Sequence, residues 1–324
     1  MRHDFRMSEM DLGGGAPSTL RGTFLHNEPM KKHVSWRAGG AAKRVYIPAD
    51  LEDLTWLVRS VPLREDIHMV GLGSNLLVRD GGVSGVVILL HGLLNKISIE
   101  NRVHGLPVGP ADADSSLVFA QAGVASPKLA RFAANNNLVG GEFWAGIPGT
   151  VGGAIAMNAG CYGGETWDKL VQVQTLNRQG QLNERFPDEY TTGYRHVALK
   201  QGDQEWFIGG WFRLPRGDGA ASRETIKSLL KQRIASQPLS LPNAGSVFRN
   251  PPGDHAARLI ECCGLKGCRI GGAQVSEKHA NFIVNVGNAS ATDIERLIEH
   301  VEDSVEARTN VRLIREVRII GERQ

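Results

Sequence analysis

The sequence has few cysteines, and their spacing is not that of a metal site. Only four occur in 324 residues, and three of them, Cys262, Cys263 and Cys268, lie close together. Structural zinc sites use two separated pairs of ligands, so we predict no metal site and reduced, mostly buried thiols. Because reduced thiols are typical of cytosolic proteins, we expect this chain in the cytoplasm.

The sequence also lacks an excess of one charge and any long apolar run. It carries 37 basic against 34 acidic residues, a balance that argues against a nucleic-acid partner. The longest apolar runs, such as VVILL at 86–90, are far shorter than the ~20 residues of a membrane span. Residues 1–20 have no apolar core of a signal peptide, so a flexible tail is expected there. We expect a monomer with no membrane partner.

Glycine, in contrast, is abundant and clustered. The chain has 39 glycines in 324 residues, about 12% against roughly 7% in an average protein. A first cluster, GLGSNLLVRDGG at 71–82, begins like a dinucleotide-binding fingerprint, but Leu76 stands at the third glycine position. The residues that follow read as a strand, whereas the Rossmann fingerprint requires a helix there. The sequence therefore predicts no Rossmann domain.

A second cluster, GIPGTVGGAIAMNAGCYGGE, occupies residues 146–165. Backbone N–H groups without side chains in the way can form a concave site for anionic oxygens. Either glycine cluster alone is compatible with simple hairpin turns. Two of them in one part of the chain favour a cofactor that bears phosphate, and the absence of a GK[ST] signature argues against a nucleoside triphosphate.

The order of the expected elements is typical of an α+β protein with two domains. Residues 35–214 are rich in strands, and residues 222–321 alternate helices with short strands. Between them, PRGDGAAS at 215–222 is the best candidate for a linker. The chain is expected to end on a strand, VRLIREVRIIGE, at 311–322.

Five motifs, taken in order, resemble the family of UDP-N-acetylenolpyruvoylglucosamine reductases, bacterial flavoenzymes of peptidoglycan synthesis. They are GLGSNLLVRDGGVSGVVI, GIPGTVGGAIAMNAGCYGGE, NAGSVFRNP, GLKGCRIGGAQVSEKHANFIVN and EVRIIGE. The first two alone indicate only the wider vanillyl-alcohol-oxidase-like FAD fold, whereas the five together are specific. The resemblance covers residues 35–321. It implies an FAD-binding domain of the vanillyl-alcohol-oxidase/PCMH-like type and a smaller α+β substrate-binding domain.

The resemblance also implies the ligands. FAD would be held by both glycine clusters, NADPH would reduce it and leave, and the nucleotide sugar would then enter the same site. The residues expected to bind FAD are Gly71, Gly73, Ser74, Asn75, Leu76, Gly146, Ile147, Pro148, Gly149, Thr150, Gly152, Gly153 and Ala154.

Four further residues match positions that act on the substrate in this family. After hydride passes from flavin N5 to C3 of the enolpyruvyl group, the serine at the position of Ser246 supplies a proton to C2. Arg195 is expected to meet the substrate carboxylate, since a guanidinium suits planar oxyanions. Glu316 is expected near C2, where it orients a water or the proton donor, and Asn250 is expected to contact the substrate. Apart from the resemblance, these would read as a turn hydroxyl and ordinary surface residues.

Two features depart from the usual pattern of the family. Val197 stands where a serine is usual, two positions after the arginine. The stretch between Gly180 and Arg195 is short, which predicts the subtype without an extra tyrosine-bearing substrate loop. His279 is interpreted as structural. The alternatives are another FAD-dependent oxidase or dehydrogenase of the same superfamily, and a non-catalytic module that binds a flavin or nucleotide sugar.

Overall fold

The computed structural model describes residues 20–100, 102–103, 106–107 and 114–324. Nearly all of the tail expected at residues 1–20 therefore lies outside the described residues. In the part that is described, no helix is both long enough and apolar enough to cross a membrane.

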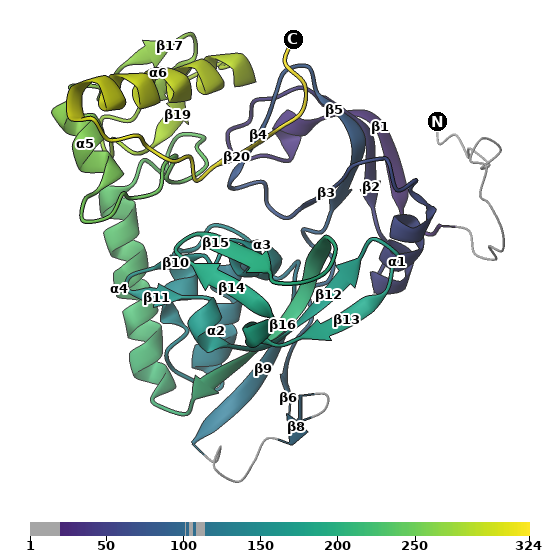
Figure 1. Ribbon diagram of the computed structural model, residues 1–324. Helices are drawn as coiled ribbons and strands as arrows, with labels where there is room; N and C mark the ends of the chain where they lie inside the picture. The colour runs from purple at the N-terminus through teal and green to yellow at the C-terminus, as the bar shows by residue number, and fades with distance from the viewer. Residues whose placement is uncertain (1–19, 101, 104–105, 108–113) are drawn as a thin grey trace.

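A four-stranded sheet in the order β1-β2-β5-β3 forms the N-terminal part (Figure 1). β1 (Thr23–Pro29) is antiparallel to β2 (Ala41–Ile47), whereas β5 (Val83–Leu89) is parallel to β2 and to β3 (Ile67–Val70). The apolar residues of β5 are buried in clusters on both faces of the sheet, as in parallel strands covered on two sides. One of these clusters includes the apolar face of α1 (Leu51–Ser60).

A second, antiparallel sheet of five strands in the order β13-β12-β16-β9-β6 follows. Its strands are β13 (Leu182–Arg185), β12 (Leu170–Asn177), β16 (Glu205–Pro215), β9 (Ser115–Gln121) and β6 (Ile97–Glu100). The two sheets share one apolar cluster, which joins residues of β5 to residues of β12 and β16. The sheets therefore form a single body.

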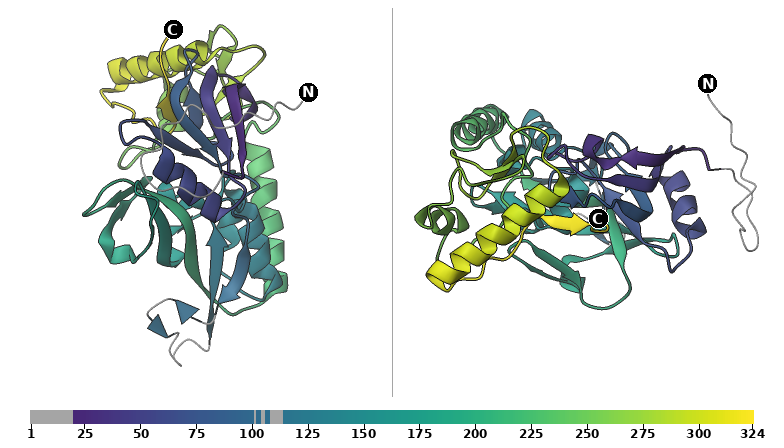
Figure 2. Two further views of the ribbon diagram at one scale, coloured as in Figure 1. Left: turned by 90° about the vertical axis from the view of Figure 1, so that its right-hand side faces the viewer. Right: turned by 90° about the horizontal axis from the view of Figure 1, so that it is seen from above.

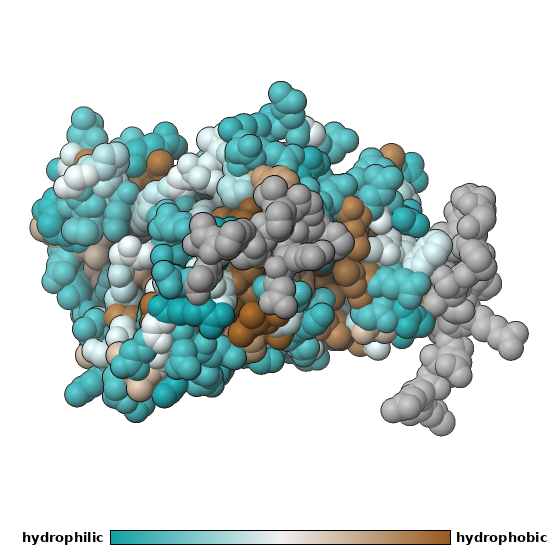
Figure 3. All heavy atoms as spheres, turned by 90° about the horizontal axis from the view of Figure 1, so that it is seen from below, coloured by the Kyte–Doolittle hydropathy of each residue, from teal (hydrophilic) through white to brown (hydrophobic). Residues whose placement is uncertain are grey.

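The two faces of the antiparallel sheet are covered differently. On one face α2 (Ser126–Asn135) and α3 (Val151–Ala156) pack into a large apolar cluster with β9, β12 and β16. The opposite face carries a smaller cluster of Leu117, Phe119 and Trp211. Figure 3, which views the molecule from below, shows apolar surface near the middle of that view.

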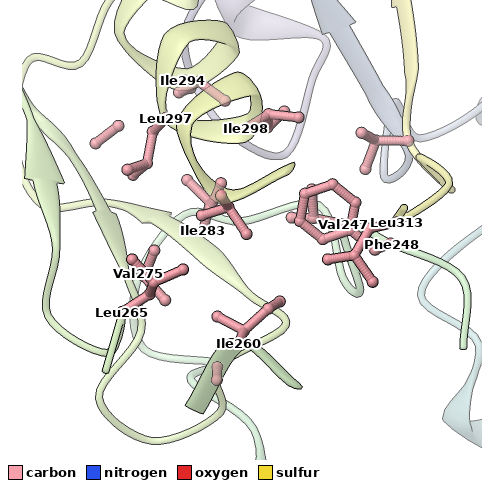
Figure 4. Packing of buried hydrophobic residues seen from close by; sticks show 14 of the residues in the cluster. Val247, Phe248, Ile260, Leu265, Val275, Ile283, Ile294, Leu297, Ile298 and Leu313 are labelled. Carbon is pink, nitrogen blue, oxygen red and sulfur yellow. The ribbon is translucent and has the colours of Figure 1, made fainter. Parts of the chain in front are cut away.

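The C-terminal part begins with the long helix α4 (Gly219–Ser236), which leads away from the antiparallel sheet (Figures 1 and 2). After it come α5 (Ala256–Cys262) and a small sheet in the order β17-β18-β19, with α6 (Ala291–Thr309) packed against that sheet. The strands are β17 (Arg269–Ile270), β18 (Ala273–Val275) and β19 (Ile283–Asn285). Figure 4 shows the apolar core that these elements share.

The remaining elements are short. They are η1 (Met30–Lys32), β4 (Leu76–Val78), β7 (Arg102–Val103), β8 (Leu106–Pro107), η3 (Glu142–Gly146), β10 (Gly160–Cys161), β11 (Gly164–Glu165), η4 (Trp167–Lys169), η5 (Pro187–Glu189), β14 (Tyr190–Gly193), β15 (His196–Leu199) and β20 (Arg318–Ile320).

The predicted linker at 215–222 is wrong in its second half, because α4 already begins at Gly219. The carboxylate of Asp218 caps the helix by accepting hydrogen bonds from the backbone N–H groups of Ala220 and Ala221, at 2.7 and 3.1 Å. Ser222 is buried and donates to Glu142 at 2.6 Å. The small residues that read as a linker are therefore the tightly packed first turn of a helix.

The packing of the two parts crosses the predicted boundary between 214 and 222. Trp36, Ala38 and Leu77 belong to the apolar core of the C-terminal part. In return, β20 leaves that part and pairs in parallel with β4, next to the first glycine cluster. The expected terminal strand at 311–322 is thus reduced to three residues, because only Arg318–Ile320 has a strand to pair with.

A charged contact fixes the first glycine cluster against α6. The guanidinium of Arg79 pairs with the carboxylate of Glu295 at 2.9 Å. The carboxylate of the adjacent Asp80 accepts from the backbone N–H groups of Ala291 and Thr292, at 3.0 and 2.8 Å. A negative charge at a helix N-terminus is favourable, so Asp80 stabilises α6 from the other part of the molecule.

Candidate active site

A cavity of about 630 Å³ lies between the glycine clusters and the C-terminal part. All thirteen residues that the sequence predicts for the cofactor line it, and so do Ser246, Arg195 and Glu316. Its volume is within the range of roughly 300–1,000 Å³ that is usual for sites of small molecules and cofactors. The structure therefore brings the predicted residues, which are spread over 246 positions from Gly71 to Glu316, to one place.

The two glycine clusters pack against each other at the wall of this cavity. A Cβ atom on Gly71 would come within 2.6 Å of the Thr150 hydroxyl, and one on Gly149 would meet Ser74 at 3.3 Å. Gly73 has φ +60°, and its Cβ would lie 2.1 Å from the His33 carbonyl oxygen. Glycine is therefore required at Gly71 and Gly73, because a side chain there would clash with Thr150 and with the backbone of His33.

Free backbone donors come from the first cluster. In the described part of the chain, the N–H groups of Leu72, Gly73, Ser74 and Asn75 have no protein acceptor, and these residues line the cavity. The second cluster differs, because its centre forms the helix α3, not a hairpin turn. Open amides beside a glycine cradle fit the pyrophosphate of FAD.

The first N–H groups of α3 are already bonded within the protein. Val151 donates to Val124 at 2.7 Å and Gly152 donates to Ala122 at 2.9 Å. Thr150 caps the helix by accepting from Gly153. The second cluster therefore contributes shape to the cavity wall, and these three amides are not available to a ligand.

Arg195 and Glu316 form an ion pair at the edge of the cavity. Nε of Arg195 donates to the Glu316 carboxylate at 2.8 Å, and a terminal nitrogen of Arg195 donates to the Gly160 carbonyl at 2.8 Å. The two side chains are only 16% and 14% exposed. Arg195 has φ +54° in the turn between β14 and β15, a conformation that is uncommon for a residue with a side chain. Such strain at a cavity wall is typical of functional positions.

Burial raises the pKa of Glu316, although the charge and hydrogen bond of Arg195 act in the opposite direction. Between its ordinary pKa of 4.5 and its raised pKa, the folded protein keeps a proton that the unfolded chain has lost. The resulting stabilisation is fully present below the ordinary pKa and is lost as pH rises through the raised one. Replacement by glutamine removes this titration.

For Glu316→Gln we therefore expect a pH-dependent difference in stability. The free energy of unfolding of the wild type, minus that of the variant, should fall as pH rises above about 4.5. Urea unfolding at several pH values measures this difference, with Glu322→Gln on the exposed end of the chain as the control. A difference for Glu316→Gln that does not change with pH would show that burial does not shift this carboxyl.

Ser246 lies in a rigid turn. Gly245 before it has φ +76° and donates its N–H to the side chain of Asn243 at 3.0 Å. Val247 and Phe248 after it are buried in the C-terminal core, near Leu313 in Figure 4. The carbonyl of Val247 also accepts the backbone N–H of Glu316 at 2.8 Å. Ser246 and Glu316 are thus fixed relative to each other through one peptide group.

Asn281 is a positioning residue that the sequence did not single out. Its buried side-chain amide accepts from the N–H of Phe248 at 3.0 Å and donates to the carbonyl of Phe248 at 2.8 Å. Its own carbonyl accepts from the N–H of Val247 at 2.9 Å. Asn281 therefore forms hydrogen bonds with the backbone after Ser246, like those between two neighbouring β-strands, and fixes the position of that segment. In the same motif His279 lies against Phe282, and burial lowers its pKa, which agrees with its structural interpretation.

Family comparisons agree with this geometry. A family model described as UDP-N-acetylenolpyruvoylglucosamine reductase, C-terminal domain, matches residues 237–320, and one described as FAD binding domain matches residues 42–184. The UDP-N-acetylenolpyruvoylglucosamine reductase of Thiobacillus denitrificans is 79% identical over 324 residues, which is the full length of both chains. The chain belongs to the UDP-N-acetylenolpyruvoylglucosamine reductase family.

Other members of this reductase family agree over nearly the whole chain. The protein of that name from Nitrosomonas eutropha is 54% identical over 308 residues, covering 94% of this chain and 90% of its own. The crystal structure of UDP-N-acetylenolpyruvylglucosamine reductase from Thermus caldophilus superimposes with a TM-score of 0.74 at 30% identity, over 93% of this chain and 99% of that one. The predicted fold is confirmed, and the protein is an FAD-containing oxidoreductase of peptidoglycan synthesis.

One residue that the resemblance to these reductases assigns to the substrate lies away from the cavity in the structure. Asn250 does not line the cavity, and its side chain accepts the N–H of Ala256 at the start of α5 at 3.1 Å. Val197 does line the cavity, and nothing in the structure explains why valine stands there.

The expectation of mostly buried thiols is wrong. Among the four free cysteines only Cys263 is buried, whereas Cys262 is exposed and the other two are half-buried. Cys161 lines the cavity, and burial raises its pKa to about 11. The compact ECCGLKGC stretch reads as a buried cluster, but α5 ends inside it and turns Cys262 outward.

Proposed function

We propose that this protein reduces the enolpyruvyl group of UDP-N-acetylglucosamine enolpyruvate to UDP-N-acetylmuramate, with NADPH as reductant, in the cytoplasm and as a monomer. The observation that supports this most is the meeting of Ser246, Arg195 and Glu316 with both glycine clusters in one cavity. The residues of both glycine clusters would hold FAD there, and FAD would supply the hydride-transfer chemistry of the reduction.

The residues predicted for the cofactor would hold FAD in two ways, by donating hydrogen bonds and by shaping the cavity wall. The open N–H groups of Gly73, Ser74 and Asn75 would donate to its pyrophosphate, since no protein acceptor competes for them in the described part of the chain. Gly149 packs against Ser74 and Gly152 packs against Ala122, where a Cβ atom would lie 3.3 and 2.7 Å from its neighbour. The other predicted residues of both clusters line the same wall and shape it.

Arg195 would bind the carboxylate of the substrate. Its guanidinium carries five N–H donors, and its bonds to Glu316, Gly160 and Asn158 leave donors for a further acceptor. Negative charge develops on the carboxylate and at C2 as the hydride arrives at C3. A fixed cation in a site that excludes water stabilises this charge strongly.

Ser246 would then give its hydroxyl proton to C2, which completes the addition of hydride and proton across the double bond. A neutral hydroxyl is a weak acid, but the enolate that it meets is strongly basic. The rigid turn holds the hydroxyl at the cavity wall, so little ordering is needed when the proton moves. Glu316, fixed through the peptide group of Val247, would orient the donor or a water.

An anaerobic stopped-flow experiment tests this function. NADPH should bleach the flavin absorbance of the purified holoenzyme, and the enolpyruvyl nucleotide sugar should restore it without oxygen. An FAD-dependent oxidase of the same superfamily would need oxygen to restore the colour. A binding module would not be bleached by NADPH at all. Either of these last two results would rule out the proposed function.

A further inference from the structure

The loop that carries Arg195 is attached to the end of the second glycine cluster through Asn158. Gly193 pairs with His196 where β14 and β15 meet, so Tyr194 and Arg195 form a two-residue loop. Arg195 has the left-handed conformation, φ +54°, which is unfavourable for a residue with a side chain. The side-chain amide of Asn158 donates to the carbonyl of Gly193 at 3.2 Å. The strained loop is therefore held at the residue directly before it begins.

The main chain around Asn158 contacts the guanidinium of the same loop. Asn158 follows α3 and has φ +41°, a left-handed conformation that asparagine adopts more readily than most residues. Its carbonyl accepts from one terminal nitrogen of Arg195 at 3.4 Å, and the carbonyl of Gly160 accepts from the other at 2.8 Å. Asn158 thus supports both the backbone of the loop and the side chain of Arg195.

The side chain of Asn158 is fully bonded inside the protein. Its amide nitrogen also donates to the carboxylate of Glu165 at 2.7 Å, and its amide oxygen accepts from the N–H of Trp167 at 3.0 Å. The residue is 3% exposed and does not line the cavity, although its neighbours Met157 and Ala159 do. Asn158 is therefore not in a position to contact a ligand there. Its influence on the reaction must pass through the groups that it holds.

We propose that Asn158 is a positioning residue for Arg195 in the reduction of the enolpyruvyl group, an inference that rests on the proposed function. The ion pair with Glu316 holds only Nε of Arg195. The carbonyls of Asn158 and Gly160 hold the two terminal nitrogens, so the direction of the guanidinium is set before the substrate binds. A donor that is fixed in advance stabilises developing charge without the cost of ordering it. Removal of the Asn158 amide would release the strained loop and displace this donor.

Asn158→Gly tests this role, because glycine tolerates the left-handed conformation and removes the amide. We expect reoxidation of the reduced holoenzyme by the enolpyruvyl substrate to slow about 10- to 100-fold in single turnovers, since a displacement of about 1 Å can cost ~10²-fold. NADPH should bleach the flavin at close to the wild-type rate. Asn288→Gly is the matched control, because Asn288 is exposed and also has a left-handed φ of +55°. It should react as the wild type does.

A double-mutant cycle with Arg195→Met separates positioning from general support of the fold. In the Arg195→Met background, Asn158→Gly should change the reoxidation rate by less than about threefold, because no guanidinium is left to position. Slowing by the same factor in both backgrounds would overturn the proposal, and so would equal slowing of the NADPH and substrate half-reactions. A reoxidation rate within about twofold of the wild type in Asn158→Gly would show that the loop needs no such support.

Because Asn158 is buried, its replacement by glycine can cost the variant its bound FAD. In that case the same cycle is measured with Asn158→Asp, which keeps the size of the side chain and the acceptor for Trp167 but loses the donor to Gly193. The same outcomes decide it. Reoxidation of the wild type is recorded in the same series. Its absence would overturn the proposed function and this role together, whereas an additive cycle would overturn the role of Asn158 alone.

Discussion

Ser246→Ala should separate the two halves of the reaction. We expect NADPH to bleach the flavin of the variant at the wild-type rate, because the hydroxyl takes no part in that step. Reoxidation by the enolpyruvyl substrate should slow by about 10²- to 10⁴-fold, the usual contribution of a positioned general acid. Single-turnover stopped flow, with the enzyme reduced before the substrate is added, measures the second step alone.

The turn itself must survive this substitution for the comparison to hold. The bonds that fix it come from the side chain of Asn243, from Asn281 and from the backbone of Glu316, and none of them uses the Ser246 hydroxyl. Ser240→Ala, an exposed serine in the same segment, is the matched control. Reoxidation of Ser246→Ala at the wild-type rate would make Ser246 a turn residue and remove it from the mechanism.

Among the substitutions proposed here, Trp36→Ala should cause the largest decrease in the free energy of unfolding. The side chain is fully buried in the core of the C-terminal part, and its Nε1 donates to the carbonyl of Ile283 at 2.8 Å. Removal of a buried tryptophan leaves a cavity and typically costs about 3–5 kcal/mol. We therefore expect the free energy of unfolding, measured with urea and circular dichroism, to fall by about that amount.

Trp36→Phe provides the comparison, since it keeps most of the apolar volume and loses the N–H donor. Its cost should be clearly smaller than that of Trp36→Ala. Equal costs for the two variants would mean that the hydrogen bond, not the packing, holds the parts together. A loss below about 1 kcal/mol in Trp36→Ala would contradict the idea that the N-terminal segment completes the C-terminal core.

The same packing explains how a site can form between two parts of one chain. Trp36 and β20 each cross to the other part, and Arg79 and Asp80 tie the first glycine cluster to α6. The cluster that lines the cavity is therefore held directly by the part that carries Ser246. The distance between the glycine-cluster wall and Ser246 is therefore fixed by these contacts and not by the connecting helix alone.

Most of the site could be predicted from the sequence, because its motifs are local. The glycine clusters can be recognised from consecutive residues alone. The turn that contains Ser246 can be recognised in the same way, from its proline, asparagine and glycine. The first cluster was correctly separated from a Rossmann fingerprint, since β4 and not a helix follows its first two glycines. Asn281 was missed because the role of a buried amide is defined only by the groups that surround it.

The errors of the sequence analysis have the same origin. Small residues at 215–222 read as a linker, although the cap of Asp218 and the packing of Ser222 place the second half of that segment in a helix. The last strand is short because its length is set by β4, which lies far away in the sequence. The type of a residue does not show which distant residues or strands it will contact in the folded chain.

The sequence by itself determined the fold class and the family, and it singled out the residues proposed to carry the chemistry, because each depends on short patterns of residue types. Within the described residues, the tertiary structure decided which backbone N–H groups of the first glycine cluster stay open and which glycine cluster forms a helix. It also decided that neither part has a complete core alone. These properties arise from contacts between residues hundreds of positions apart, and so only the folded chain contains them.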